Sequence, residues 1–185
     1  MERAFFARAT LDIARELLGC QLVRVLDGQR LSGTITETEA YVGEEDRASH
    51  ASVGRTARNA VMYGPPGYAY VYLIYGVHHC LNVVTEREGF PAAVLIRGLQ
   101  PEEGIDIMRR RRPGRPDPEL TNGPGKLCQA LRIDRTLNGT DLVAGETLFI
   151  ERNSPVDETR ILATPRIGVR GDEAAVTAPW RFVVT

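Results

Sequence analysis

A chain of 185 residues with 43% hydrophobic and 25% charged residues can bury one ordinary core, which excludes a disordered or fibrous protein. No apolar stretch approaches the roughly 20 residues of a membrane-spanning helix, and the N-terminus lacks the long apolar region of a secretory signal, so we expect a cytoplasmic protein with no membrane contact. Cys20, Cys80 and Cys128 are far apart and without CxxC spacing, which indicates buried thiols rather than disulfides or a zinc site.

Four helices are predicted. Residues 10–18 carry one apolar stripe, with Thr10 as the expected N-cap and Gly19 as the residue after the helix end, a pattern typical of a packing helix. Shorter helices are expected over three further ranges: 56–62, 101–110 and 124–132. The second of these begins with Pro101 and two glutamates, which suit a helix N-terminus.

Strands are predicted where β-branched and aromatic residues alternate or cluster: Gly33 to Glu39, 70–75, 80–85, 92–97, 147–151 and 181–184. They outnumber the helices and do not alternate with them, which favours an α+β fold over a doubly wound one. We therefore expect a single domain over residues 1–185, with surrounding helices on a mainly antiparallel curved sheet. The prolines and glycines of 111–125 sustain neither regular period and predict a flexible surface loop.

A β-hairpin is predicted from strands 70–75 and 80–85, because only four residues separate them: Gly76, Val77, His78 and His79. Tyr75 then lies at or beside the hairpin tip. Along a regular strand Tyr70 and Tyr72 face one side and Tyr75 the other, so one core cannot take all three rings. At least one ring is expected to meet a ligand or solvent.

The charge distribution leaves two readings open. A net charge of −1 argues against a nucleic-acid partner, yet all basic residues except Lys126 are arginines, and five of these crowd positions 109–115. Arginine presents a planar fork that suits phosphate oxygens. The alternative is a solvated loop with no binding role.

Candidate chemistry concentrates between positions 41 and 79, which hold all six tyrosines and all three histidines. Tyrosines at strand spacing are also what a buried core contains. Just upstream, Glu37 and Glu39 share a strand face, and Tyr41 follows two residues later. A carboxylate among aromatic rings loses hydration, which suits it to general-base work, but composition does not choose among the acids of this segment.

Four sequence blocks carry a resemblance to a known family: ETEAYVGEEDRASHA, GRTARNAVMYGPPGYAYVYLIYGVHHCLNVV, AVLIRGLQP and NGPGKLCQALRI. In their order, spacing and residue identities, these blocks resemble the alkyladenine (3-methyladenine) DNA glycosylase family, and the resemblance runs from about residue 10 to the C-terminus. The resemblance implies a monofunctional enzyme that flips a purine such as 3-methyladenine, 7-methylguanine, hypoxanthine or ethenoadenine out of duplex DNA and hydrolyses its bond to the sugar. It further implies a monomer, associated with the nucleoid in a prokaryote, that acts on damaged double-stranded DNA without a cofactor.

The resemblance also implies catalytic and pocket residues. Glu39 is expected to be the general base that activates the attacking water, while Arg97 helps to hold that water and the neighbouring phosphate. Tyr41 and Tyr72 are expected to form opposing walls of the base pocket. His50 is expected at the pocket edge, in contact with the flipped purine.

Three further roles follow from the same resemblance. Asn82 is expected to clash with the exocyclic amine of guanine, and the backbone carbonyl of Ile167 to touch the attacking water. Tyr75 is expected to be the wedge that enters the duplex from a protruding hairpin. The tip departs from the family pattern, because His78 and His79 stand where an aromatic pair is expected.

Two mechanistic expectations and one rival remain. No lysine falls in the pocket segment and no metal-ligand cluster is visible, so we expect hydrolysis without a metal and without strand cleavage. The rival is a non-catalytic nucleic-acid-binding module, because the implied fold resembles the tRNA-binding C-terminal domain of methionyl-tRNA formyltransferase. Such a module needs no general base, so Glu39, Arg97 and Asn82 in family-matching contexts favour the enzyme.

Overall fold

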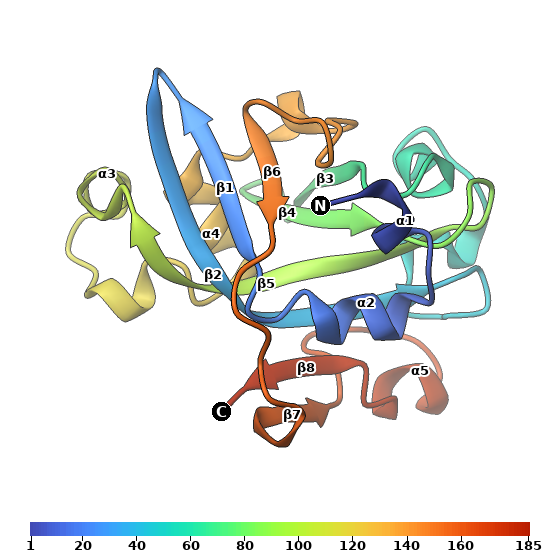
Figure 1. Cartoon of the computed structure of the whole chain (residues 1–185). Coiled ribbons are helices and arrows are strands. Elements are labelled where there is room, and N and C mark those ends of the chain that lie inside the picture. Colours follow the sequence, from blue (N-terminus) through green and yellow to red (C-terminus); the bar gives the residue numbers. More distant parts are fainter.

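One antiparallel sheet organises the molecule, which is described over residues 1–185 by a computed structural model (Figure 1). Its eight strands are β1 (Gln21–Leu26), β2 (Gln29–Val42), β3 (Ala69–Ile74), β4 (His78–Val84), β5 (Ala92–Glu103), β6 (Leu148–Glu151), β7 (Ile161–Thr164) and β8 (Arg181–Val184). The strand order is β3-β4-β5-β2-β1-β6, while β8 pairs with both β2 and β7. The predicted single α+β domain with a mainly antiparallel sheet is therefore confirmed.

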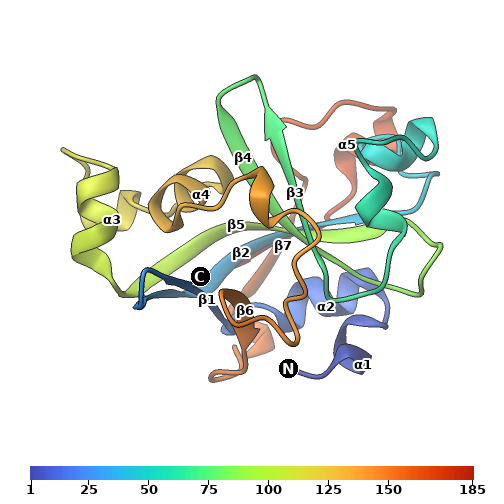
Figure 2. The same ribbon diagram turned by 90° about the horizontal axis from the view of Figure 1, so that it is seen from above.

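Short helices and 3-10 turns surround this sheet. The α-helices are α1 (Arg3–Phe6), α2 (Thr10–Glu16), α3 (Ile105–Arg111), α4 (Pro124–Leu131) and α5 (Glu173–Thr177). The 3-10 turns are η1 (His50–Val53), η2 (Ala60–Tyr63), η3 (Asp117–Glu119), η4 (Arg135–Leu137) and η5 (Glu158–Arg160). Helix α2 packs on β2 and β5, and α4 packs on β4 and β5. Seen from above, the β3–β4 hairpin rises away from α1 and α2 (Figure 2).

The alternation of the strands divides the buried side chains between two faces of the sheet. On β3 and β4, Val71 and Val83 belong to the large apolar core that also takes side chains from α2 and α4. Tyr70 and Val84 belong instead to a small cluster with Met62 of η2. Because successive side chains point to opposite faces, the second face of this sheet carries the small cluster that packs against η1 and η2.

The central strand pair β2–β5 is bent by bulges. The register skips Thr36 on β2, where Ile35 pairs with Leu99 and Glu37 with Gly98. It skips Arg97 on β5, because Thr38 pairs with Ile96. A bulged residue is released from the ladder and its side chain is re-aimed. Both bulges lie directly beside Glu37.

Three helix predictions are wrong in their boundaries. Residues 101–103 belong to β5, where Glu103 pairs with β2 and accepts hydrogen bonds from Arg30 and Ser32, so α3 begins only at Ile105. Thr10 is the first residue of α2 and not its N-cap, and its N–H and hydroxyl both donate to the Glu86 carboxylate. A distant carboxylate thus replaces the expected local cap. The predicted helix at 124–132 corresponds to α4, whereas the helix predicted at 56–62 is reduced to the 3-10 turn η2, which begins only at Ala60.

The hairpin connection is shorter than predicted. His78 and His79 belong to β4, so Tyr75, Gly76 and Val77 alone join the strands. The stretch 111–125, expected as a loop, contains η3 and the start of α4 and is anchored by the buried residues Leu120 and Thr121. Strands β1 and β7 and helices α1 and α5 were not predicted.

Candidate active site

One row of directly paired residues crosses five strands of the sheet. Tyr70 on β3 pairs with Asn82 on β4, which pairs with Leu95 on β5. Leu95 pairs with Glu39 on β2, and Glu39 pairs with Arg181 on β8. Directly opposite residues share one face of a sheet, so this row brings chain segments from positions 39 to 181 together. Most of the predicted site residues lie on or beside it.

A cleft of about 700 Å³ opens on this face of the sheet. Every predicted site residue except Glu39 lines it: Tyr41, His50, Tyr72, Tyr75, Asn82, Arg97 and Ile167. The volume falls within the range of roughly 300–1,000 Å³ that holds small molecules and cofactors. The structure therefore places seven residues, chosen from far apart in the chain, around a single cavity.

Glu39 is fully buried and lies directly behind the cleft wall. Its Oε1 accepts a hydrogen bond of 2.8 Å from the backbone N–H of Ile167, and its Oε2 accepts one of 2.8 Å from the Tyr41 hydroxyl. A guanidinium nitrogen of Arg97 lies 3.3 Å from Oε2. These three partners all line the cleft. Ile167 contacts Glu39 through its N–H, a contact that the sequence did not suggest.

Arg97 links the two glutamates that were expected to share a strand face. Its Nε donates to Glu37 at 3.0 Å, while Glu37 also accepts from Arg181 at 2.6 Å. Burial lowers the pKa of the Arg97 guanidinium, but Glu39 and Glu37 outweigh that effect and raise it overall. Arg97 therefore stays charged and holds both carboxylates on the side of the cleft. Its bulged position on β5 permits this double contact.

Tyr41 and Tyr72 keep their phenolic protons. Burial, followed by the neighbouring Glu39, raises the pKa of Tyr41 well above its ordinary value. Burial, followed by Cys80, does the same to the pKa of Tyr72. Neutral rings in a dry wall are suited to stacking, and the Tyr41 hydroxyl is fixed as a donor to Glu39.

His50 is held against two tyrosines at the edge of the cleft. Its Nδ1 lies 2.9 Å from the Tyr70 hydroxyl, and its ring centre lies 4.5 Å from that of Tyr72. Burial, followed by Arg58, lowers the pKa of His50, so the neutral imidazole is favoured. Burial also raises the pKa of Tyr70 to about 12. Sequence analysis placed Tyr70 on the face of Tyr72 but gave it no role at the site.

Asn82 is fixed in one orientation on the cleft floor. It is 3% exposed, and its Nδ2 donates to the backbone carbonyl of Tyr70 at 3.0 Å. That bond assigns the amide orientation from the hydrogen-bond network. The rigid side chain of Asn82 consequently presents a constant shape to whatever enters the cleft.

Tyr75 projects from the β3–β4 turn and is 82% exposed. Tyr75 and Gly76 have φ of 52° and 72°, and the Val77 N–H donates to the carbonyl of Ile74 at 3.2 Å. Two successive left-handed residues are the signature of a type I′ turn, which matches the twist of the hairpin strands. The expectation that one of the three tyrosine rings lies outside the core is confirmed.

Cationic side chains line the cleft although the net charge of the chain is −1. Besides Arg97, four cationic side chains line it, and we call these four the cationic rim: Arg112, Arg115, Lys126 and Arg170. Lys126 donates to Asn122 at 2.8 Å. The only lysine of the chain thus reaches the cleft from α4, so the absence of lysine from the pocket segment does not exclude it from the site.

Comparison with known proteins decides the family. A family model described as methylpurine-DNA glycosylase (MPG) matches residues 4–185. The chain belongs to the methylpurine-DNA glycosylase family. A relative from Methanocella arvoryzae is 53% identical over 183 residues, which cover 98% of this chain and 90% of the relative. Relatives from Carboxydothermus hydrogenoformans and Bacillus cytotoxicus are 50% and 46% identical, covering 98% and 96% of this chain and 93% and 92% of their own length. All three are provisionally named 3-methyladenine DNA glycosylase.

The predicted family and enzyme class are confirmed by this membership, and the protein is a DNA glycosylase of DNA repair. The family assignment also decides against the rival reading as a non-catalytic module. None of the protein's helices combines the length and the apolar character that a membrane span requires. No group of three or more His, Cys, Asp or Glu side chains is arranged to hold a metal ion.

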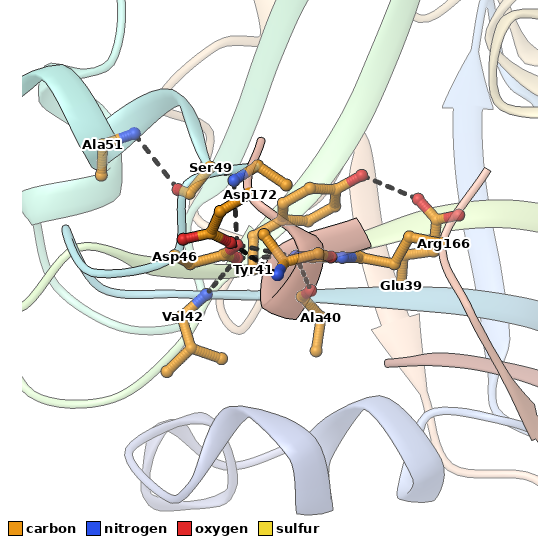
Figure 3. Close-up of polar contacts among 11 residues, drawn as sticks. Glu39, Ala40, Tyr41, Val42, Asp46, Ser49, Ala51, Arg166 and Asp172 are labelled. Carbon is orange, nitrogen blue, oxygen red and sulfur yellow. Dashed lines mark hydrogen bonds and ion pairs between the residues drawn. The ribbon is translucent and has the colours of Figure 1, made fainter. Parts of the chain in front are cut away.

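One feature of this glycosylase site was missed entirely. Sequence analysis did not choose among the acids of this segment and gave Asp46 no role, yet the Asp46 side chain is fully buried in an ion pair with Arg166. Glu44 and Glu45, from the same segment, are exposed. The two partners are separated by 120 residues, and no local pattern reports such a contact. The pair lies directly beneath Tyr41 (Figure 3).

Proposed function

We propose that this protein is a monofunctional glycosylase that flips alkylated or deaminated purines out of duplex DNA and hydrolyses the N-glycosidic bond. Its substrates are 3-methyladenine, 7-methylguanine, hypoxanthine and ethenoadenine. The observation that carries the proposal is a carboxylate, Glu39, held by three residues that line an aromatic cleft. The names of the relatives point to the same substrate class.

Extrusion of the nucleotide is supported by the shape and charge around the cleft. A base inside a duplex hides its glycosidic bond, and flipping it costs a few kcal/mol. Tyr75 stands on the same side of the protein as the cleft and is free to fill the gap in the duplex. The cationic rim suits the phosphates on either side of the flipped nucleotide.

Recognition of the base rests on Tyr41 and Tyr72 in the cleft wall. Stacking on an aromatic ring stabilises a bound base by roughly 1–3 kcal/mol, and a cationic alkylated purine adds attraction to the π face. His50 contacts the edge of the purine. Asn82, held rigidly in the cleft, clashes with the exocyclic amine of guanine, which disfavours ordinary guanine relative to adenine-type bases.

Hydrolysis follows from the remaining capacity of the Glu39 carboxylate. Oε1 accepts one hydrogen bond, from Ile167, and each carboxylate oxygen can accept two. A water bound to Oε1 transfers a proton to Glu39 as its oxygen bonds to the anomeric carbon, and the base leaves with the electrons of the broken C–N bond. The carboxylate also stabilises the oxocarbenium character of the sugar. Arg97 orients the carboxylate and contacts the neighbouring phosphate.

The decisive experiment compares the wild type with Glu39→Gln on duplex DNA that carries one 3-methyladenine or hypoxanthine. Glutamine keeps the shape but loses the basic carboxylate, so we expect base release to fall by roughly 10²–10⁴-fold with lesion binding retained. Glu45→Gln, an exposed acid of the same segment, is the matched control and should retain full activity. Full activity of Glu39→Gln would remove Glu39 from the mechanism.

The same assay tests the monofunctional and metal-free parts of the proposal. Because Lys126 lies at the rim, borohydride is added during the reaction to trap any Schiff base. We expect no trapped protein–DNA complex and no strand cleavage. Base release should persist in EDTA, and its loss with recovery on adding a divalent ion would contradict the mechanism.

A further inference from the structure

A buried ion pair lies beneath the aromatic wall of the cleft. The side chains of Arg166 and Asp46 are both fully buried and form two hydrogen bonds, of 2.6 Å and 2.8 Å. Arg166 also donates to the backbone carbonyls of Ala40 and Ala175, both at 2.9 Å (Figure 3). Its guanidinium therefore joins β2 to the C-terminal segment that carries α5.

This one pair supports both hydrogen-bond donors of Glu39. Ile167, whose N–H donates to Oε1, is the next residue after Arg166 in the chain. The guanidinium lies 4.7 Å from the ring centre of Tyr41, whose hydroxyl donates to Oε2. Trp180 lies 5.0 Å from the guanidinium as well, so Arg166 has little freedom to move.

Asp46 extends the same support toward His50. Its carboxylate accepts hydrogen bonds from the N–H groups of Val42 and Ala48, at 3.2 Å and 3.1 Å. Its backbone carbonyl accepts from Ser49, the residue before His50. The ion pair consequently fixes the ends of the loop between Tyr41 and the edge of the cleft.

Stability alone does not account for this arrangement. Buried ion pairs are often no more stabilising than apolar residues of similar volume, because both charges lose their hydration. The Nε of Arg166 is moreover buried without a hydrogen-bond partner. What the pair does achieve is a fixed geometry for two donors that meet at one carboxylate.

We propose that Arg166 and Asp46 form a positioning clamp that holds the Tyr41 hydroxyl and the Ile167 N–H on Glu39 and thereby sets the orientation of the general base. The catalytic part of this inference rests on the proposed function. The positioning part concerns the protein alone. A readout that needs no activity, the hydrogen exchange of the Ile167 amide measured by NMR, therefore tests it separately.

The test variant is Arg166→Met combined with Asp46→Asn. Asp46→Asn alone would leave a buried cation without a counter-ion and could prevent folding, whereas the double variant removes both charges. The control is Arg24→Met, which also removes a buried arginine with an unpartnered Nε, but on β1 and outside the cleft. Thermal melting of both variants shows whether they lose similar amounts of stability.

We expect the Ile167 amide to lose protection in the double variant and to keep it in Arg24→Met. Single-turnover base release should slow by about 10- to 100-fold in the double variant, because small displacements of catalytic groups reduce rates by that order. In a Glu39→Asp background, where the shorter carboxylate cannot keep both donors, the double substitution should add less than about threefold, because coupled residues are not additive.

Unchanged Ile167 protection in a folded double variant would overturn the clamp. So would a rate loss that multiplies in full on Glu39→Asp, because that is the behaviour of a merely structural pair. A wild type that releases no base would instead defeat the proposed function, and the Ile167 exchange would still decide the positioning role.

Discussion

Tyr75 combines an exposed aromatic ring with a left-handed backbone conformation, φ 52°. A side chain with a Cβ is disfavoured there by roughly 1–2 kcal/mol, and asparagine tolerates the region better than most residues. The ring is therefore placed outward at a cost in stability and contributes nothing to the core. That combination is expected of a residue kept for a contact with another molecule.

Tyr75→Asn should separate contact from stability. Asparagine preserves the turn, so the free energy of unfolding should stay within about 0.5 kcal/mol of the wild type. Loss of the wedge should weaken lesion-specific binding and excision together, by about 10- to 100-fold, because the flipped state costs a few kcal/mol without its plug. Binding titration, single-turnover excision and thermal melting measure the three effects.

The matched control is Leu162→Asn, which replaces another exposed apolar residue on β7, outside the cleft. It should leave excision and binding unchanged. A markedly lower melting temperature for Tyr75→Asn with normal lesion affinity would contradict the wedge role.

Asn82 should act as a filter because its side chain cannot turn away from the cleft. Asn82→Ser shortens the group that faces the base and should raise excision of guanine-type lesions relative to adenine-type lesions. The hydrogen bond to the Tyr70 carbonyl is also lost, which should cost roughly 1 kcal/mol of stability. Competition between two lesions in one reaction measures the ratio, and an unchanged ratio would remove Asn82 from selectivity.

At the scale of elements, η1 depends on a neutral histidine. Its first residue, His50, is held between Tyr70 and Tyr72, and Arg58 lies close enough to disfavour a second positive charge. Asn59 donates to the carbonyls of His50 and Gly54 and so closes the turn. Protonation of His50 would place a charge in this desolvated cluster.

The stability of the fold should therefore decrease at mildly acidic pH. The pKa of His50 is lowered in the folded state, so the unfolded chain takes up its proton first as the pH falls through about 6.5. The free energy of unfolding then decreases until the pH reaches the lowered pKa of the folded state. Melting curves between pH 7.5 and 5 should show this decrease in the wild type and less of it in His50→Gln. Equal pH dependences would contradict the assignment.

The elements were predictable where local pattern and burial agree. Alternating residues placed Tyr70 and Tyr72 on one face, and the β-branched runs gave six of the eight strands approximately. The helix predicted to begin at Pro101 failed because pairing with β2 continues through Glu103, which Arg30 and Ser32 hold from across the sheet. Such long-range pairing overrides a local helix signal.

The site was predictable only in part for the same reason. Glu39 and Arg97 were assigned through a resemblance. The bulge that lets Arg97 contact two glutamates is not indicated by any periodicity of the sequence. Lys126 and the Arg166–Asp46 pair come from segments joined only by the fold. A contact between residues more than about 100 positions apart in the chain leaves no local pattern in a single sequence.

At the scale of the whole molecule, the distribution of charge matters more than its sum. The chain carries a net charge of −1, yet five cationic side chains line the cleft: Arg97, Arg112, Arg115, Lys126 and Arg170. Acidic residues lie elsewhere, many in surface pairs such as Arg8 with Glu16 and Arg109 with Asp117. A nearly neutral protein can thus attract phosphates on one face, where counterion release favours binding.

Binding to undamaged duplex DNA should report this distribution through its dependence on salt. Arg115 is exposed at the rim, so Arg115→Gln should weaken binding to all sequences alike and reduce the slope of log K against log salt by about 0.9, as for one lost phosphate contact. Arg152→Gln changes the net charge equally, but Arg152 lies over the ring of Phe5, outside the cleft, and its substitution should leave the slope unchanged. Fluorescence anisotropy measures both slopes between about 50 and 200 mM salt. Over this range, the affinity of a protein that makes several phosphate contacts changes by orders of magnitude. Equal slopes for the two variants would show that net charge, and not the rim of the cleft, governs the attraction to DNA.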